Sequence, residues 1–174
     1  MADSLNTTRR ALLLVLTTAL AFALSGCSSP QPAPEGFQIV RLNGVDYTLE
    51  LVSDDATRTV GLGGRESIPE HGGMLFSFPN ARMRQFVMRD CLVDIDILFL
   101  DASGRIVATH AMTIEEPKKD TETQPAYERR LKKYSSRFPA QFAIEIRGGL
   151  LETMTYKPGD KIELDLEYLK SVTQ

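Results

Sequence analysis

IDILFLDASGRIVATHAM, residues 95–112, is the clearest core element of this sequence. Its first six residues are strongly apolar, Asp101–Gly104 is rich in turn formers, and Arg105–Met112 runs back. Side chains of a strand alternate between two faces, so one face would carry Ile95, Ile97 and Phe99. Leu98 and Leu100 would make the other face of the strand apolar as well. The stretch therefore predicts a buried β-hairpin.

Further strands are expected on both sides of this hairpin. Asn43-Gly44 separates two strand-like runs, and both residues tolerate the positive φ of a two-residue hairpin turn. The predicted strands outside residues 95–112 are 37–42, 45–52, 74–78, 85–89, 142–146 and 162–169. Short helical segments are expected over 53–62 and 149–156. Short strands between turn signals favour a mainly β fold, a compact antiparallel β-sandwich or barrel-like domain with a few short helices.

Residues 113–137 form a charged insertion, which is expected to be partly helical. Pro125 is well placed to begin a helix. One stripe of that helix would carry Tyr127, Leu131, Tyr134 and Phe138. Two interpretations follow: a basic helix that faces an anionic lipid or polymer, or a helix that docks its aromatic stripe on the core. The second interpretation is preferred because it needs no partner.

The N-terminal region is typical of an export signal. Residues 11–24, ALLLVLTTALAFAL, follow Arg9-Arg10 and are shorter than the about 20 apolar residues of a membrane span. The next residues, Leu24-Ser25-Gly26-Cys27, resemble the lipobox of bacterial lipoproteins. The resemblance implies cleavage before Cys27 and acylation of its thiol and new amine. An ordinary signal peptide or a buried N-terminal helix would be the alternative.

This interpretation divides the chain into a signal peptide over 1–26, a flexible Ser/Pro/Gly tether over 27–36 and a single domain over 37–169. Lipidation would hold the protein on a membrane, and Ser28 suggests the outer membrane, facing the periplasm, in a Gram-negative cell.

Cleavage removes Arg9, Arg10 and Asp3, so the formal net charge moves from −3 to −4. This mildly negative net charge does not favour nucleic acid binding. Cys91 would then have no partner within the chain, and it is expected to be buried, reactive or paired with another protein.

Several segments in order resemble the bacterial and archaeal family DUF192. The matching residues are Gly61, Leu62, Arg65, Gly73, Met74, Leu75, Phe76, Phe78, Phe86, Met88, Asp96, Phe99, Asp101, Gly104, Val107, Tyr134, Ser135, Gly148, Gly159 and Asp160. The resemblance implies a compact antiparallel β-sandwich or barrel-like fold. Where the family has Trp-Met-Lys-Asn-Thr, this chain has Val87-Met88-Arg89-Asp90-Cys91, so a site at that strand end would be altered or lost.

Residues near the predicted strand ends give the candidate ligand-binding residues. They are Arg65, Met88, Arg89, Asp90, Asp96 and Tyr134. Asp94 and Asp96 lie two residues apart, and paired carboxylates can hold Ca²⁺ or share acid/base work. Asp96 could equally accept backbone hydrogen bonds or pair with Arg65 or Arg89.

No familiar catalytic, phosphate-binding or metal-binding pattern is present in the sequence. His71 and His110 each lack a second ligand at metal spacing. No catalytic residue, metal or cofactor is therefore assigned. We expect a lipid-anchored accessory or binding module of the cell envelope, with an envelope protein, a glycan or a small ligand as partner. The alternatives are a small hydrolase that uses the Arg/Asp cluster and a purely structural envelope lipoprotein, and the question of catalysis stays open.

Overall fold

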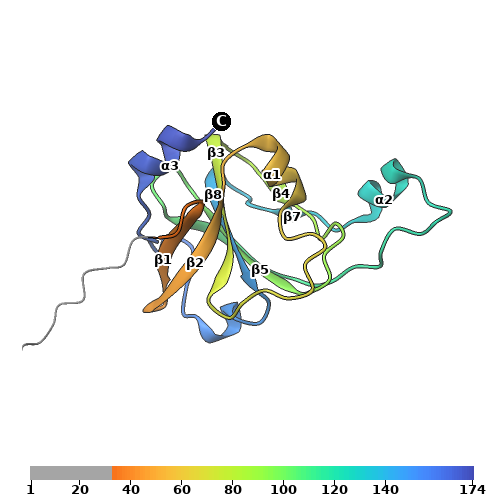
Figure 1. The fold of residues 1–174 in the computed structure, drawn as a ribbon, viewed down its shortest axis with the longest axis horizontal. Coiled ribbons are helices and arrows are strands. Elements are labelled where there is room, and N and C mark those ends of the chain that lie inside the picture. The colour runs from red at the N-terminus through yellow and green to blue at the C-terminus, as the bar shows by residue number, and fades with distance from the viewer. Residues whose placement is uncertain (1–32) are drawn as a thin grey trace, which may run out of the picture. The chain divides into compact units, whose positions relative to one another are not determined.

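A six-stranded mixed sheet organises the chain (Figure 1), in the order β1-β2-β3-β8-β5-β6. The computed structural model describes residues 33–174, so the signal-peptide and lipidation predictions lie outside the described residues. The strands of this sheet are β1 Phe37–Leu42, β2 Val45–Val52, β3 Gly72–Arg82, β5 Ile95–Leu100, β6 Ile106–Met112 and β8 Ala140–Arg147. Two short strands, β4 Gln85–Phe86 and β7 Tyr134–Ser135, form a second sheet. The mainly β prediction is confirmed.

Four short helices connect or cover the strands. They are α1 Asp55–Val60, α2 Gln124–Arg130, the 3-10 turn η1 Leu151–Thr153 and α3 Leu166–Val172. Asp54 caps α1, because its side chain accepts a hydrogen bond from the Thr57 backbone N–H. Among the described residues, no helix is long and apolar enough to cross a membrane.

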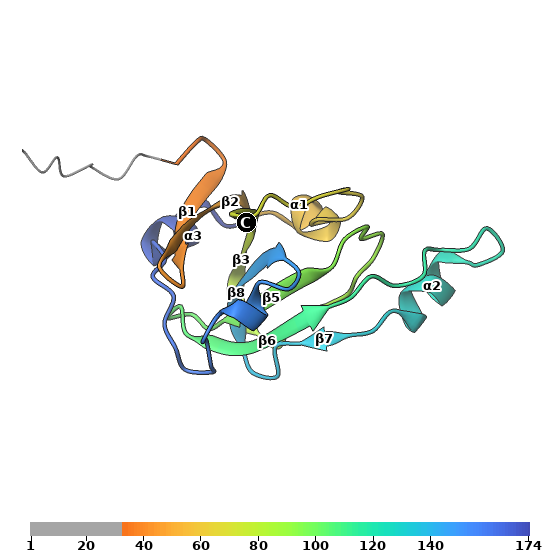
Figure 2. The same cartoon turned by 90° about the horizontal axis from the view of Figure 1, so that it is seen from below.

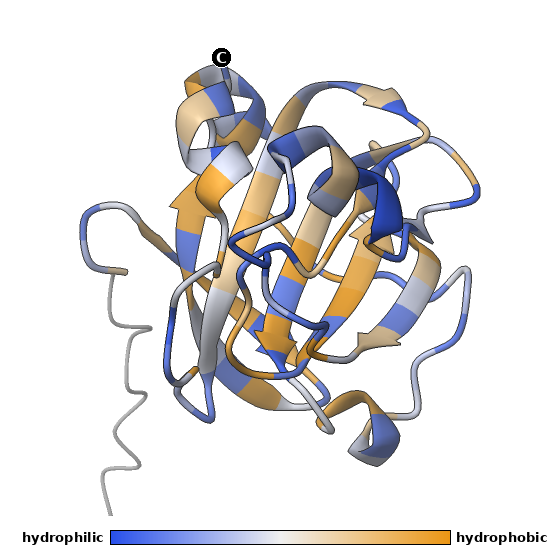
Figure 3. Cartoon of the chain, turned by 90° about the vertical axis from the view of Figure 1, so that its right-hand side faces the viewer, coloured by the Kyte–Doolittle hydropathy of each residue, from blue (hydrophilic) through white to orange (hydrophobic). Residues whose placement is uncertain are grey.

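The predicted hairpin of β5 and β6 is confirmed and forms part of two hydrophobic clusters. β5 pairs with β6 on one side and with β8 on the other, and all six of its residues are buried. Ile95, Ile97 and Phe99 belong to the first cluster, whereas Leu98 and Leu100 belong to the second. Figure 3 shows the hydrophobic residues concentrated on these central strands. The sheet is therefore covered on both faces.

The sheet is mixed because β2 and β3 run parallel. A parallel pair needs a crossover connection, and α1 with the loop to Gly72 supplies it. The sheet does not close into a barrel. The first cluster is covered by α1 and the small β4-β7 sheet, and Phe86 of β4 packs edge-on against Phe76 and Phe99.

Two predicted elements were wrong in detail. The strand expected over 162–169 is a single bridge between Arg105 and Lys161, after which Asp165 caps α3. The helical stripe expected to reach Phe138 ends at Arg130, and Tyr134 instead pairs with Phe86. Tyr127, Leu131 and Tyr134 are nevertheless buried, whereas Phe138 is 61% exposed. The loop before α2 and α2 itself extend beyond the sheet (Figure 2).

Candidate functional site

The six candidate residues from the sequence do not form one site. Arg65 binds Glu50 of β2 through Nη2 and Oε2 at 2.7 Å. Asp96 is 1% exposed and its Oδ2 accepts a hydrogen bond from the Leu151 backbone N–H at 2.7 Å. Burial raises the pKa of the Asp96 carboxyl, although backbone N–H groups of residues 149–151 oppose that shift. Asp96 therefore holds η1 in place, and it forms no ion pair with an arginine of residues 33–174.

Asp94 and Asp96 serve different parts of the backbone. Asp94 Oδ1 accepts a hydrogen bond from the Ile114 N–H at 2.8 Å, whereas Asp96 Oδ2 accepts one from the Leu151 N–H of η1. Within residues 33–174, no group of three or more His, Cys, Asp or Glu side chains is arranged to hold a metal ion. The paired-carboxylate interpretation is not supported by this geometry.

The remaining four candidates lie around the turn that follows β4. Met88 and Tyr134 are buried in the first cluster. Asp90 adopts a φ of 53° and accepts a hydrogen bond from the Tyr127 hydroxyl at 3.1 Å. Arg89 binds Glu128 of α2, with 2.7 Å between Nε and Oε1. These contacts fasten α2 to the domain. Of the six candidates, only Arg89 also lines a large cleft on this face of the sheet.

That cleft lies between α1 and the β3-β4 segment and has a volume of about 930 Å³. Its apolar walls include Val60, Leu62, Phe76, Phe78, Met83 and Phe86. Its polar lining includes Asp55, Arg58, Arg82, Arg84, Arg89 and Glu145, together with Cys91. The volume falls in the range of about 300–1,000 Å³ that is usual for small-molecule sites. We therefore take this cleft as the candidate site.

Three arginines gather at the β3 end of the cleft. The Arg84 guanidinium lies 3.8 Å from the Phe78 ring centroid, and that of Arg58 lies 5.4 Å from it. Arg84 is 7% exposed and bonds only to carbonyl or amide oxygens, those of Asn80 and Ala140. Burial, together with the charges of Arg82 and Arg58, lowers the pKa of Arg84 to about 10. The group stays charged at neutral pH but is held among like charges.

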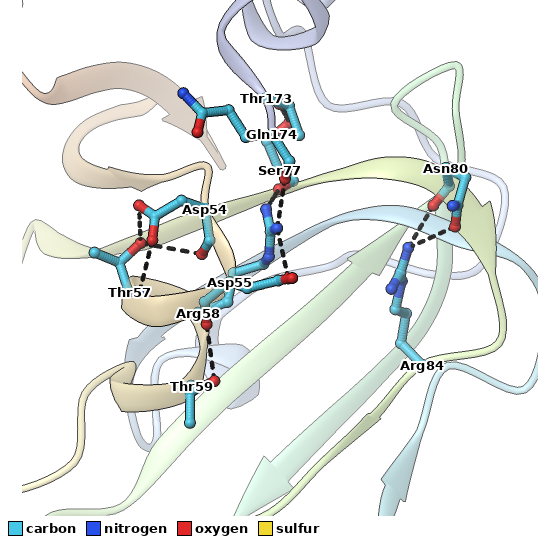
Figure 4. Close-up of polar contacts among 10 residues, drawn as sticks. All are labelled: Asp54, Asp55, Thr57, Arg58, Thr59, Ser77, Asn80, Arg84, Thr173 and Gln174. Atoms are coloured by element: carbon cyan, nitrogen blue, oxygen red, sulfur yellow. Dashed lines mark hydrogen bonds and ion pairs between the residues drawn. The ribbon is translucent and has the colours of Figure 1, made fainter.

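Arg58 occupies the wall between α1 and β3. Its side chain is 8% exposed and donates to the carbonyl oxygens of Ser77, at 2.7 Å, and Gln174, at 2.6 Å (Figure 4). Its carboxylate partner, Asp55, is fully exposed to solvent. Arg82 has no ion pair within the described part of the chain. Positive charge at this end therefore exceeds negative charge.

The floor of the cleft carries an acid and a thiol. Glu145 of β8 is 5% exposed, and no hydrogen bond from residues 33–174 contributes to the pKa of its carboxyl. Burial raises the pKa of this carboxyl from 4.5 to about 8. Burial also raises the pKa of the nearby Cys91 thiol to about 12, and the charges of Glu145 and Asp90 add to that shift. Both groups are therefore neutral at pH 7.

Two glycines give the Glu145 region its shape. Gly61, with φ 54°, ends α1, and a Cβ on it would lie 3.5 Å from the Phe76 ring. Gly73 lies against the Glu145 carbonyl so closely that a Cβ would come within 2.0 Å of its oxygen. A larger residue at 73 would force β3 away from β8.

Sequence reasoning missed Arg58, Arg82, Arg84 and Glu145. The one local signal was Glu145 itself, an acid inside the apolar run Phe142–Ile146. The three arginines carry no such signal, because only the fold brings α1 beside the end of β3.

The mainly β fold is similar to that of proteins of known structure. A candidate transcription regulator from Sinorhizobium meliloti 1021 is 25% identical, with a TM-score of 0.58, over 72% of this chain and 89% of that chain. A protein of unknown function from Novosphingobium aromaticivorans DSM 12444 is 23% identical, with a TM-score of 0.57, over 72% of this chain and 82% of that chain. No curated protein matches the chain.

Residues 38–164 match the sequence profile of DUF192, described as "Uncharacterized ACR, COG1430". The chain belongs to this family. The match spans every strand of the domain and α1, α2 and η1, so it includes all residues of the cleft.

Proposed function

We propose that this protein is a ligand-binding module of the bacterial cell envelope, held on the membrane by lipid on Cys27, and that its cleft binds a small organic anion. The tether of residues 27–36 would separate the domain from the lipid surface. The single observation that carries the ligand proposal is the cleft of about 930 Å³ with three arginines at one end.

The charge at that end favours an anion. Arg58, Arg82 and Arg84 lie close enough for two of them to lower the pKa of the third. The one acid at this end, Asp55, points into solvent, and Glu145 is neutral at pH 7. A carboxylate, sulfate or phosphate group at this end would relieve the repulsion among the guanidinium groups.

The apolar walls favour an organic ligand over an inorganic ion. Phe86 packs edge-on against Phe76 and Phe78, and all three rings line the cleft. Val60 and Met83 lie on its rim and are 68% and 64% exposed. A hydrocarbon or aromatic ligand body would bury these surfaces, which contributes about 25 cal/mol for each Å² removed from water.

The hydrolase alternative receives less support. Asp96 binds η1 on the opposite face of the sheet, whereas Arg89 lines the cleft, so the proposed Arg/Asp cluster is not assembled. The Cys91 thiol, with its pKa raised to about 12, is a weak nucleophile at pH 7. Binding is therefore the better-supported use of the cleft.

The test compares three probes of equal length and different charge: octanoate, 1-octanol and octylammonium. Both hydrophobic clusters lie between Val40 and Leu169, so the fragment 28–174 contains both cores. Titrations followed by ¹H–¹⁵N spectra should show octanoate shifting the amide signals of Thr59, Gly61 and Gln85. Octanoate should bind at least tenfold more tightly than octylammonium.

A charge-reversal pair separates the cleft from general electrostatics. Arg82→Glu should weaken octanoate binding about tenfold or more, because it changes the charge beside the ligand by two units. Arg129→Glu, on an exposed position of α2 outside the cleft, makes the same change in net charge and should leave the affinity unchanged. Equal affinity for all three probes, or equal effects of the two variants, would contradict the proposal.

A further inference from the structure

Glu145 is the most unusual polar side chain of the described chain. It is 5% exposed and lines the cleft, and no hydrogen bond from residues 33–174 contributes to the pKa of its carboxyl. In the described part of the chain, the fully buried side-chain atoms without a partner are Arg89 Nε and Asp96 Oδ1, so the carboxyl of Glu145 is not sealed off and can meet a group in the cleft. The Oε2 atom lies near Gly61, 3.9 Å from where a Cβ would stand there, so the carboxyl faces the α1 side of the cleft.

The surroundings of Glu145 keep it uncharged. Across the sheet it pairs with Met74 and Ile97, and the next residues in that row are Glu50 and His110. Glu50 is engaged by Arg65. The turn after β4 contributes Arg89 and Cys91 to the same cleft, of which Arg89 is engaged by Glu128, and Asp90 lies between them in the chain. With no cation assigned to it, burial alone sets its protonation, and the carboxyl remains a neutral O–H donor at pH 7.

We propose that Glu145 donates a hydrogen bond to an uncharged acceptor oxygen of the bound anion, and that the cleft releases this ligand when Glu145 ionises. The inference rests on the proposed function, because it assumes that the anion occupies the same cleft. It narrows the ligand class to organic anions that carry a carbonyl or hydroxyl oxygen at the end away from the charge.

The spacing along β8 sets the length of such a ligand. Arg58 binds the Ser77 carbonyl, and Ser77 pairs with Phe142, three residues from Glu145. Arg84 binds the Ala140 carbonyl, five residues from Glu145. At a rise of about 3.3 Å per residue, the acceptor and the anionic group would lie about 10–16 Å apart. An extended chain of about nine to fourteen atoms covers this distance between the two ends.

The test uses methyl hydrogen sebacate, which has a carboxylate at one end and an ester carbonyl at the other, and undecanoate, which lacks the carbonyl. Affinities of the fragment 28–174 are measured by calorimetry from pH 7 to pH 9, with circular dichroism at each pH to establish that the protein is folded. If only neutral Glu145 binds the ester, the affinity of the wild-type fragment for the ester should fall about tenfold from pH 7 to pH 9. The Glu145→Gln variant keeps a hydrogen-bond donor but cannot ionise. Its affinity for the ester should therefore change less than twofold between pH 7 and pH 9.

Glu145→Leu supplies the second variant. It removes the donor and keeps an apolar side chain, so it should lose the preference for the ester over undecanoate while it still binds undecanoate. An equal pH dependence in the wild type and Glu145→Gln would overturn the role of Glu145 and leave anion binding intact. Tighter binding of 10-aminodecanoate than of the ester would also overturn it, because Glu145 would then be an anion that accepts from an ammonium group. Binding of none of these anions would refute both proposals.

Discussion

Replacing Glu145 with Gln should stabilise the domain, and the gain should grow with pH. Burial raises the pKa of the Glu145 carboxyl from 4.5 in its ordinary state to about 8 in the folded protein. The folded state therefore binds a proton that the unfolded state has already released over this interval. For such a group, the contribution to stability is fully present below pH 4.5 and is lost as the pH rises to 8.

The size of the change in the free energy of unfolding follows from the pKa shift of Glu145. Each pKa unit corresponds to about 1.4 kcal/mol, so a shift of about 3.5 units removes about 5 kcal/mol of the free energy of unfolding between pH 4.5 and 8. About 3 kcal/mol of this is already lost at pH 7. Because Glu145 is almost wholly buried, solvent screening reduces these values little. The loss is large beside the 5–15 kcal/mol that is typical of a folded domain.

The assay is urea unfolding of the wild type and Glu145→Gln at pH 5, 6, 7, 8 and 9. All other titrating groups are shared, so the difference between the two unfolding free energies isolates Glu145. It should rise by about 1.4 kcal/mol per pH unit between pH 5 and 8 and then level off. Glu66→Gln, at an exposed position, gives the baseline for exchanging a carboxyl for an amide. A difference that does not depend on pH would refute the argument, because it would mean that water solvates the Glu145 carboxyl.

Three further predictions concern other parts of the chain. Asp96→Ala should leave the Leu151 N–H without its acceptor and lower the free energy of unfolding by about 1–3 kcal/mol, while octanoate affinity stays the same because Asp96 lies outside the cleft. Native Cys91 should react with an aromatic disulfide reagent at pH 8 far more slowly than the urea-unfolded protein does, because burial raises the pKa of its thiol; equal rates would show an accessible thiolate. Cys27→Ser should abolish incorporation of labelled palmitate and move the protein from the membrane to the soluble fraction, whereas retention on the membrane would rule out lipidation as its anchor.

Local patterns predicted the strands well where side-chain alternation and turn chemistry agree. The β5-β6 hairpin and the β1-β2 hairpin with its Asn43-Gly44 turn are both present, and both turn residues have positive φ. The parallel pairing of β2 with β3 could not be predicted from local patterns, because it depends on the crossover formed by residues 53–71. The alternation over 162–169 was misread because Asp165, which begins α3, fits an exposed strand position as well as a helix cap.

The site was harder to predict because its residues are joined only by the fold. Arg58 comes from α1, Arg82 and Arg84 from β3 and the loop after it, and Glu145 from β8. The family resemblance directed attention to the turn after β4, where this chain has Arg89, Asp90 and Cys91. Those residues mostly fasten α2 and the core. The contacts of Asp90 and Arg89 with α2 give this turn a structural role, and Arg89 and Cys91 also line the cleft, so the departure from the family pattern changes part of its wall.

The two faces of the sheet explain why a binding cleft can form on one side only. On the face of the second cluster, residues 150–169 close over the strands, and Asp96 holds η1 there with a buried hydrogen bond. On the other face, α1 and the β4-β7 sheet cover the strands separately and leave the cleft between them. Backbone carbonyls hold Arg58 and Arg84 of this cleft, and these contacts fix the positions of the two guanidinium groups without neutralising their charge. A ligand anion is the group that completes such an arrangement, and the neutral acid of Glu145 adds no negative charge that would oppose its entry.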